Sequence, residues 1–254
     1  EKYQVPAIIL TDKYLGESYW STKEFDKKIP IERGLILSDE DMKDAKNYRR
    51  YKITDTGVSP RAIPGTKNGM HVASSYEHDE KGFEREEEPI RVAMHNKRFR
   101  KVEFIEKELD EPKIDGPDNA KITIVGWGST KGAIKEAMKI LDKSGISVNY
   151  LQVLYLSPFP ASSLKEILAK SNTVVDVENN KTGQLASLIK ENTGLDVDYK
   201  VLKYDGRPFT PEDLAQVIRD IAENKADKII TVNGYVEGNK EPDSVKMRTF
   251  KVLK

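Results

Sequence analysis

The sequence predicts an α/β protein whose second half folds around a parallel β-sheet. From about residue 121, apolar segments of strand length alternate with amphipathic segments of helix length. Gly145 and Gly194 end two of these predicted helices, as glycine commonly does because it adopts positive φ without strain. Strands that alternate with helices of this length indicate βαβ crossovers, and therefore a parallel sheet.

The elements of this half follow from their patterns in chain order. The last predicted helix has Thr210 as its cap, Pro211 at its first position and Asp213 three residues after the cap, an arrangement typical of a helix start. The predicted strands span 121–128, 146–156, 172–179 and 196–204, and the predicted helices span 129–145, 164–171, 182–194 and the segment from 210.

The first 120 residues follow a different pattern. Residues 5–12, "VPAIILTD", predict a fully buried strand, although a central parallel strand needs neighbours on both sides. Residues 21–82 are irregular, 86–110 predict a helix with Pro89 near its start, and "DEPKIDGPDNA" predicts a linker. The helix carries a rough apolar stripe of Ile90, Met94, Val102, Ile105 and Leu109. A long irregular segment of this kind is usually functional or covers a partner.

Composition excludes several classes of function. The 42 basic and 42 acidic residues give zero net charge, which argues against a nucleic-acid-binding protein. No apolar run has the length of a membrane span and no signal-peptide core is present, so we expect a cytoplasmic protein. The absence of cysteine excludes disulfides, thiolate zinc sites and cysteine-bound iron–sulfur clusters in this chain. The 33% charged residues and four glutamines lean towards a thermophile.

The three histidines suggest a metal site at first sight. His71, His78 and His95 fall within 25 positions, close to Glu77, Asp79 and Glu80. Zinc proteases, however, place two histidines four residues apart on one helix, whereas His71 and His78 are seven apart in a predicted loop. A metal site, a polar loop that pairs with its neighbours, and a loop near another subunit's active site all stay open.

A glycine-rich turn follows the first strand of the regular half. Gly126, Gly128, Ser129 and Thr130 lie in "GWGSTKG", where a helix N-terminus can bind an anion. The dinucleotide fingerprint needs a third glycine at Lys131, so NAD binding is disfavoured. A tight turn without ligand and a phosphate or subunit contact are the alternatives.

Two further stretches hold polar candidates. Arg61 stands between two prolines in "VSPRAIPG", where it could bind a carboxylate or phosphate, or lock the loop to its own domain. In "VENNKTGQLA", four polar side chains follow a strand end, where ligands gather in open parallel sheets. They are Glu178, Asn179, Asn180 and Gln184. A lone carboxylate is weak evidence for acid–base chemistry, and the sequence assembles no complete catalytic set.

Seven motifs in order carry a family resemblance. They are "AIILTDKYLGES", "RRYKITDTGVSPRAIPG", "SSYEHDEKGFE", "TIVGWGSTKGAIKEA", "LYLSPFP", "VENNKTGQLASLI" and "YDGRPFTPEDL". Together they resemble the C-terminal part of the alpha subunit of 2-oxoacid:ferredoxin oxidoreductases, most of all the archaeal 2-oxoglutarate synthase type. Each motif is weak alone, but seven in the family's order are specific.

The resemblance implies a thiamine diphosphate enzyme made of several subunits. It implies oxidative decarboxylation of a 2-oxoacid, with coenzyme A as acyl acceptor and ferredoxin as electron acceptor. A beta subunit would hold the [4Fe–4S] cluster and most contacts to thiamine diphosphate and Mg²⁺, so this chain would bind no cofactor alone. The expected partners are therefore this beta subunit, the upstream part of the alpha subunit, ferredoxin and coenzyme A.

The resemblance also implies three segments. Residues 1–30 would end a pyrimidine-side domain, 31–120 would form an irregular linking and interface segment, and 121–254 would resemble the C-terminal domain of transketolase. The family's tyrosine-proline-isoleucine-threonine-proline motif is missing, so we expect a C-terminal piece without the substrate-selecting residues.

The resemblance gives the loop around His78 a role in the interface. We expect Arg61, Glu77, His78 and Asp79 to serve the interface or to support the site from behind, without metal. The alternatives are a non-catalytic assembly module of the same fold and an independent metal-dependent enzyme built on the histidine loop.

Overall fold

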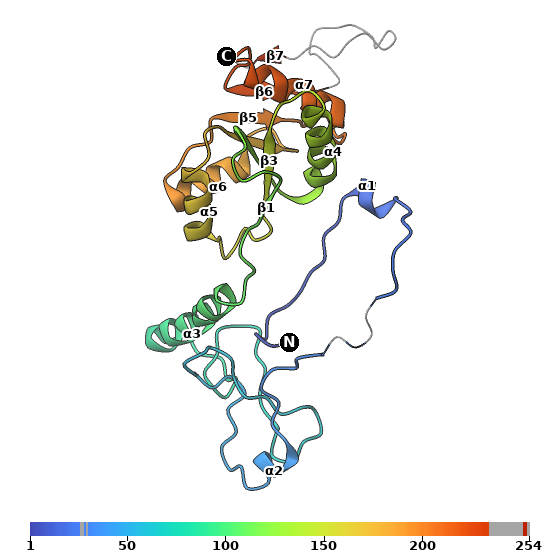
Figure 1. The fold of residues 1–254 in the computed structure, drawn as a ribbon. Coiled ribbons are helices and arrows are strands. Elements are labelled where there is room, and N and C mark those ends of the chain that lie inside the picture. Colours follow the sequence, from blue (N-terminus) through green and yellow to red (C-terminus); the bar gives the residue numbers. More distant parts are fainter. Residues whose placement is uncertain (26–27, 29, 234–250, 253–254) are drawn as a thin grey trace, which may run out of the picture. The chain divides into compact units, whose positions relative to one another are not determined.

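The structure, a computed structural model, describes residues 1–25, 28, 30–233 and 251–252. The chain divides into a first unit, Glu1–Glu108, and a second unit, Leu109–Lys254 (Figure 1). The predicted linker 110–120 belongs to the second unit, where it contributes the short strand β1 (Ile114–Asp115).

The second unit is built on one sheet. Its strands lie in the order β1-β3-β2-β4-β5-β6-β7, with the five inner strands parallel and β1 and β7 antiparallel at the edges. The other elements are β2 (Ile122–Gly126), η1 (Gly128–Thr130), α4 (Lys131–Asp142), β3 (Val148–Gln152), α5 (Ala161–Ala169), β4 (Val174–Glu178), α6 (Gln184–Thr193), β5 (Tyr199–Leu202), α7 (Pro211–Ala222), β6 (Ile229–Thr231) and β7 (Lys251–Val252). The predicted α/β class and parallel sheet are confirmed.

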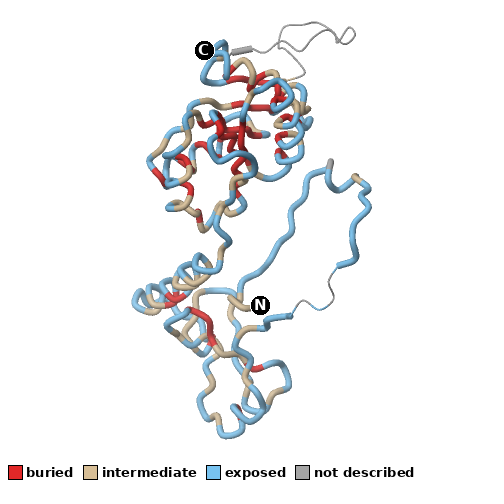
Figure 2. Tube along the Cα trace, viewed as in Figure 1, coloured by how far each residue is buried: buried red, intermediate tan, exposed pale blue. Residues whose placement is uncertain are grey.

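Helices cover both faces of this sheet. α4 packs with α7, and α5 packs with α6. Side chains of β2 alternate between the two layers: Ile124 joins the core beneath α4 and α7, whereas Val125 joins the core beneath α5 and α6. Every residue of β2 and β4 is buried, which explains their nearly continuous apolar sequences (Figure 2).

The helix ends of the second unit agree with the sequence signals. The Thr210 side chain accepts a hydrogen bond from the Asp213 N–H at 3.2 Å, and Pro211 is the first residue of α7. Gly194 ends α6 with φ of +78°. Strands β1, β6 and β7 were not predicted, because each is only two or three residues long.

The first unit has little regular structure. It contains the short helices α1 (Lys13–Gly16) and α2 (Asp39–Met42), and the long helix α3 (Glu88–Glu106). The predicted helix with Pro89 in its first turn is therefore confirmed. The predicted irregular segment is also observed, as turns and loops with two isolated β-bridges.

The buried strand predicted for residues 5–12 was wrong for this chain. These residues form no strand, and Ile8, Ile9 and Leu10 are 82%, 95% and 89% exposed. The physical reason is that no described segment pairs with them, so their backbone groups and apolar side chains face solvent. The expectation that this segment lacks pairing neighbours is met among the residues that the structure describes.

The predicted apolar stripe of α3 was also only partly right. Met94 is buried, but Val102 is 39% exposed, and the second buried residue of the helix is Lys97. Cationic side chains of α3 donate to backbone carbonyls of the irregular segment and tie it to the helix. These pairs are Lys97 with Tyr51 (3.0 Å), Arg100 with Thr54 (2.9 Å) and Lys101 with Gln4 (3.2 Å). The helix is thus charged, as expected, but its contacts with the irregular segment are made by cations as well as by the apolar stripe.

Within the described part of the chain, no helix combines the length and the apolar character needed to cross a membrane.

Candidate functional site

The three histidines do not converge on one point. His71 and His78 both contact the ring of Tyr51, with centroids 6.3 and 4.0 Å away, whereas His95 packs on Phe99 in α3. The Nδ1 atom of His78 lies 3.1 Å from the Asp79 carbonyl oxygen. Among the residues that the structure describes, no three histidine or carboxylate groups are placed to hold a metal ion.

The carboxylates of the same loop are occupied by partners inside the first unit. Arg98 of α3 donates to both oxygens of Glu77, at 3.1 and 2.5 Å, and this pairing lowers the pKa of Glu77. Glu80 pairs with Arg49 and accepts from the Ile53 N–H at 2.8 Å. These contacts hold the loop against α3, as expected of a polar structural loop.

Asp79 closes the turn that follows His78. It accepts hydrogen bonds from the Lys81 N–H at 2.8 Å and the Phe83 N–H at 3.2 Å, and Arg85 lies 3.4 Å away. Burial acts to raise the pKa of Asp79, but these donors outweigh it, so the pKa is lowered. Asp79 is therefore ionised, and its carboxylate stabilises the turn.

Arg61 is used to join segments of the first unit. Its Nη2 atom donates to Glu1 at 3.0 Å and to the Arg33 carbonyl at 3.1 Å. Its backbone N–H donates to the Leu35 carbonyl, and its carbonyl accepts from Leu37, both at 2.8 Å. Of the two sequence-based alternatives, these contacts match the arginine that locks a loop to its own domain.

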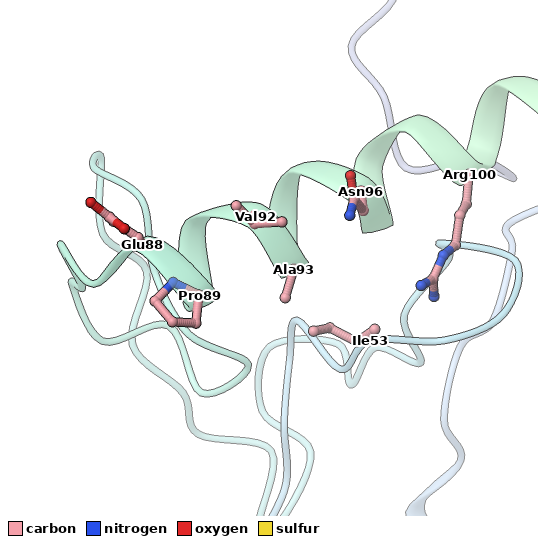
Figure 3. Close-up of a pocket in the computed structure, with 7 residues that line it drawn as sticks. All are labelled: Ile53, Glu88, Pro89, Val92, Ala93, Asn96 and Arg100. Atoms are coloured by element: carbon pink, nitrogen blue, oxygen red, sulfur yellow. The ribbon is translucent and has the colours of Figure 1, made fainter.

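An open groove lies along α3 in the first unit (Figure 3). It has a volume of about 600 Å³ and an apolar floor, with charged side chains at its two ends. Its lining residues are Ile53, Glu88, Pro89, Val92, Ala93, Asn96 and Arg100. Arg100 already donates to the Thr54 carbonyl, and the lining includes no nucleophile or histidine.

The glycine-rich turn of the second unit is tightly packed. Gly126 ends β2, and a Cβ there would lie 2.9 Å from the Thr130 hydroxyl and 3.0 Å from a methyl group of Ile134. Gly128 has φ of +58°, and the Thr130 hydroxyl donates to the Trp127 carbonyl at 2.9 Å. Ser129 lies within η1 between them. Close packing and the positive φ explain both glycines without a ligand.

The polar candidates at the end of β4 divide into two pairs. Asn180 accepts from the Thr182 and Gly183 N–H groups at 3.0 and 2.8 Å, and donates to Glu178 at 2.7 Å. Asn179 and Gln184 are exposed at the surface. The structure therefore brings Glu178 and Asn180 together, and leaves the other two outside the cluster.

Glu178 occupies the place where open parallel sheets usually bind ligands. β2 leads into α4 on one face and β4 leads into α6 on the other, so the sheet's switch point lies between the ends of these adjacent strands. The buried Glu178 accepts from Trp127 Nε1 at 3.0 Å and from the Leu185 and Ala186 N–H groups of α6 at 2.8 and 3.3 Å. The helix N-terminus that could hold an anion thus holds a carboxylate of the chain itself.

A second buried acid, Asp176, lies two residues before Glu178 on the same side of β4. Both Asp176 oxygens are buried and accept no hydrogen bond from a donor, and Lys200 is its register partner on β5. Burial and the neighbouring Glu178 raise the pKa of Asp176 well above its usual value, and Lys200 only partly opposes this. Burial also acts to raise the pKa of Glu178, but Asp176 and the donors around Glu178 lower it. Of the two acids, Asp176 is therefore the one that keeps its proton to the higher pH.

Sequence reasoning missed Trp127 and Asp176. The available signals were an indole inside a Gly-Trp-Gly turn and an acid in the middle of the apolar strand "VVDVE". The arrangement anchors a strand end to a helix start. No nucleophile with an adjacent base is formed in the described residues of this cluster.

Comparison with known proteins shows similarity along most of the chain. Residues 120–214 match the family described as pyruvate:ferredoxin oxidoreductase core domain II. The chain is 35% identical over 240 residues to the alpha subunit of 2-oxoacid:ferredoxin oxidoreductase 2 from Aeropyrum pernix, a match covering 92% of this chain and 36% of the relative. It is 34% identical to the alpha subunit from Saccharolobus solfataricus, covering 92% of this chain and 37% of that one.

A solved structure is also similar. It is the 2-oxoglutarate:ferredoxin oxidoreductase from Magnetococcus marinus with 2-oxoglutarate, coenzyme A and succinyl-CoA bound. It aligns with a TM-score of 0.61 and 32% identity, over 70% of this chain and 31% of that one. The chain spans about a third of the length of the curated relatives above. By its sequence and its fold, the chain belongs to the family of 2-oxoacid:ferredoxin oxidoreductase alpha subunits.

Proposed function

We propose that this chain is a scaffold and interface segment of a thiamine diphosphate-dependent 2-oxoacid:ferredoxin oxidoreductase. The complex would decarboxylate a 2-oxoacid, transfer the acyl group to coenzyme A and reduce ferredoxin. The observation that carries the proposal is the 35% identity to an alpha subunit over 92% of the chain. Those polar candidates whose hydrogen-bond and ion-pair partners lie within this chain support a structural role for it in that activity.

The residues present do not fit the cofactors of such a complex. The sequence has no cysteine to ligate a [4Fe–4S] cluster. Glu178 is fully buried and already accepts four hydrogen bonds. Its oxygens are therefore poorly available to coordinate Mg²⁺. The cluster, Mg²⁺ and most contacts to thiamine diphosphate therefore belong to partner subunits in this proposal.

The exposed segment 5–12 is the proposed contact to the upstream part of the alpha subunit. Three consecutive apolar side chains of this segment are almost fully exposed: Ile8 at 82%, Ile9 at 95% and Leu10 at 89%. Contiguous exposed apolar side chains mark interaction sites, and an unpaired extended segment can add a strand to a sheet edge. In this proposal residues 1–30 complete the pyrimidine-side domain, and the loop of Arg61, Glu77, His78 and Asp79 faces the rest of the complex.

Reconstitution tests the proposal. The chain is co-expressed with an upstream alpha segment and a cysteine-bearing beta subunit of the family. Assembly is followed by native mass, and reduction of ferredoxin is followed with 2-oxoglutarate and coenzyme A. We expect a complex whose turnover requires this chain. A complex that turns over equally well without the chain would contradict the enzyme segment and support a non-catalytic assembly module.

Two matched substitutions locate the interface. Ile9→Asp should weaken assembly at least tenfold, because it places a charge in the proposed strand contact. Leu154→Asp alters an apolar residue of the second unit that is 62% exposed, and should leave assembly unchanged. Equal effects of the two substitutions would remove segment 5–12 from the proposal.

His78→Ala tests the loop. It should weaken assembly or activity, because it removes the ring that packs on Tyr51 with a centroid separation of 4.0 Å. The metal content of the reconstituted complex, measured by elemental analysis, should not change. Loss of stoichiometric metal in this variant would instead support a metal site on the histidine loop.

A further inference from the structure

Strand β4 places two acidic side chains inside an apolar layer. Asp176 and Glu178 are both 0% exposed and lie two positions apart, so their side chains project from the same face of the sheet. Val174, two positions earlier, faces the same way and belongs to the core beneath α5 and α6. Asp176 and Glu178 thus form a buried acid pair within this layer.

The two members of the acid pair differ in their partners. Glu178 accepts four hydrogen bonds, including two from N–H groups at the start of α6 and one from the Trp127 indole. Both oxygens of Asp176 are buried and accept no hydrogen bond from the residues that the structure describes. Two neighbouring carboxylates in an apolar layer strongly disfavour each other's charge. The donors therefore assign the first negative charge to Glu178, and Asp176 is the acid that ionises at the higher pH.

Lys200 of β5 lies within reach of the acid pair. It is the register partner of Asp176, and paired residues of neighbouring strands lie only about 5 Å apart. Its side chain instead runs along Gly183, the N-cap of α6, where an added Cβ would lie 3.0 Å from Lys200 Cδ and 3.4 Å from Nζ. The Lys200 ammonium group forms no ion pair within the described part of the chain, and the N-terminal end of a helix disfavours a cation. Lys200 is therefore available as a counterion for Asp176.

The remaining surroundings of Asp176 are apolar. Among the described residues, the charged groups that act on it are Glu178 on its own strand and Lys200 on β5. Its register partner on the other side, in β2, is Val125. The helices packed on this face contribute apolar side chains to the same layer: Leu164 and Leu168 of α5, and Leu185 and Ile189 of α6.

We propose that Asp176, Glu178 and Lys200 form a proton-linked switch that controls how firmly the start of α6 is held. With Asp176 protonated, Glu178 carries the single negative charge of the acid pair and holds the first turn of α6. When Asp176 releases its proton to solvent, Lys200 turns from Gly183 to pair with it. Repulsion between the two carboxylates then weakens the hydrogen bonds that Glu178 accepts.

The switch lies where a change of shape would matter. Glu178 ends β4 next to the end of β2, at the point of the sheet where open parallel sheets bind ligands and partners. Release of a proton from Asp176 would therefore alter the edge of the second unit that other molecules meet. The switch is a property of the second unit and does not depend on the proposed role of the chain in a complex.

The fluorescence of Trp127 reports the state of the switch, because its indole donates to Glu178 at 3.0 Å. Trp20→Phe replaces the other tryptophan, which is 74% exposed in the first unit, so that all tryptophan emission comes from Trp127. We expect one transition in the emission wavelength as the pH of the full chain rises from about 4 to about 9, above the ordinary pKa of an aspartate. The transition should disappear when Asp176→Asn is added. No transition in Trp20→Phe, or an equal one in both variants, would overturn the proposal.

Two lysine substitutions in the Trp20→Phe background test the counterion. Lys200→Met should move the transition to higher pH by about one unit or more, because ionised Asp176 loses its nearby cation. Lys165→Met removes an exposed cation from α5, on the same side of the sheet, and should leave the midpoint unchanged. Equal midpoints in the two lysine variants would overturn the switch as proposed.

Hydrogen exchange shows whether titration of Asp176 moves α6. The amides of Leu185 and Ala186 donate to Glu178, so they should exchange severalfold faster in the wild type than in Asp176→Asn at a pH above the transition. Below the transition the two proteins should exchange equally. Comparison at one pH removes the effect of base catalysis on the exchange rate. A fluorescence transition without this difference would show that Asp176 titrates while α6 stays in place, and would overturn the switch.

Discussion

The two units of this chain are stabilised in different ways. In the second unit, two apolar cores sandwich a sheet, and side chains such as Ile134, Leu141 and Leu164 are fully buried. In the first unit few apolar residues are buried, and ion pairs and cations that donate to carbonyl groups hold the irregular segments on α3. The second unit is therefore stabilised mainly by burial of apolar surface, and the first unit by many directional polar contacts.

This difference fits the proposed division of roles. A domain with its own apolar core can fold alone, whereas a segment held by polar contacts at its surface depends more on what surrounds it. The exposed apolar residues of the first unit, from Ile8 to Leu10 among others, show where such surroundings would attach.

The largest expected effect lies in the core of the second unit. Leu141→Ala removes a fully buried side chain of α4 and should lower the free energy of unfolding by about 2–5 kcal/mol. Val92→Ala alters α3 of the first unit, where the side chain is 58% exposed, and should change it by less than about 0.5 kcal/mol. Urea denaturation followed by circular dichroism measures both. A small effect of Leu141→Ala would contradict the picture of a tightly packed core.

The next largest effect concerns Lys97, a buried cation of the first unit. Burial lowers the pKa of Lys97 from 10.5 to about 8, with the nearby cations Lys101, Arg50 and Arg98 adding to the shift. The unfolded chain then binds more protons than the folded chain between pH 8 and 10.5, so stability should rise with pH across this range. The shift corresponds to about 3 kcal/mol.

Lys97→Met should remove this pH dependence. Relative to the wild type, the variant should be more stable at pH 7 than at pH 10.5, by about 3 kcal/mol between the two conditions. Lys107→Met, at an exposed position after the same helix, serves as the control and should show no such change. Identical pH profiles for the wild type and Lys97→Met would mean that Lys97 is not desolvated.

Whether the sequence could predict a structural feature of either unit depends on the kind of interaction that forms that feature. The strands and helices of the second unit were predicted because apolar periodicity and caps are local signals: "TIVG" and the Thr210 cap report their own structure. The buried Lys97 could not be predicted in this way, since its position depends on Tyr51, a residue 46 positions away.

The candidate sites show the same limit. The sequence placed Glu178 and Asn180 correctly at a strand end. It did not reveal the contact of Glu178 with Trp127, which is 51 positions away and follows the neighbouring strand β2. The strand expected at 5–12 shows the opposite case. Its pattern is clear, but strand formation needs a partner strand, and none of the residues that the structure describes pairs with this segment.

Glu178 and Asp176, the two buried acids of β4, should affect stability differently when each is replaced by its amide. Glu178→Gln should destabilise the second unit by about 2 kcal/mol, because four donors, including two at the start of α6, lose a charged acceptor. Asp176→Asn should not, because it puts a neutral side chain of the same shape in place of a buried carboxyl group whose pKa is already raised.

The pH dependence of the same pair has a definite sign. The folded-state pKa of Asp176 is raised, so its contribution to stability is complete below the unfolded pKa near 3.8 and is lost as pH rises through the folded value. Asp176→Asn should therefore gain stability relative to the wild type as pH increases from 4 upward, which thermal denaturation across pH can follow. Equal profiles would show that Asp176 is not protonated in the folded chain.

The smallest expected effect concerns the ion pair that holds the histidine loop on α3. Arg98 lowers the pKa of Glu77, and Arg98 is partly exposed, so the pair should contribute only about 0.5–1 kcal/mol. Because the folded pKa is depressed, this contribution is present above the unfolded pKa near 4.5 and is lost as pH falls through the folded value.

Glu77→Gln should therefore destabilise the first unit by about 0.5–1 kcal/mol at pH 7, and less in high salt, which screens half-exposed pairs. At pH 3 the difference between the variant and the wild type should be smaller than at pH 7, since the wild-type carboxylate loses its charge as the pH falls through its folded pKa. Urea denaturation at the two pH values measures the difference. A loss at pH 7 as large as that of Leu141→Ala would show that a single ion pair dominates the first unit, whereas the contrast between the two units requires its stability to be spread over many weak contacts.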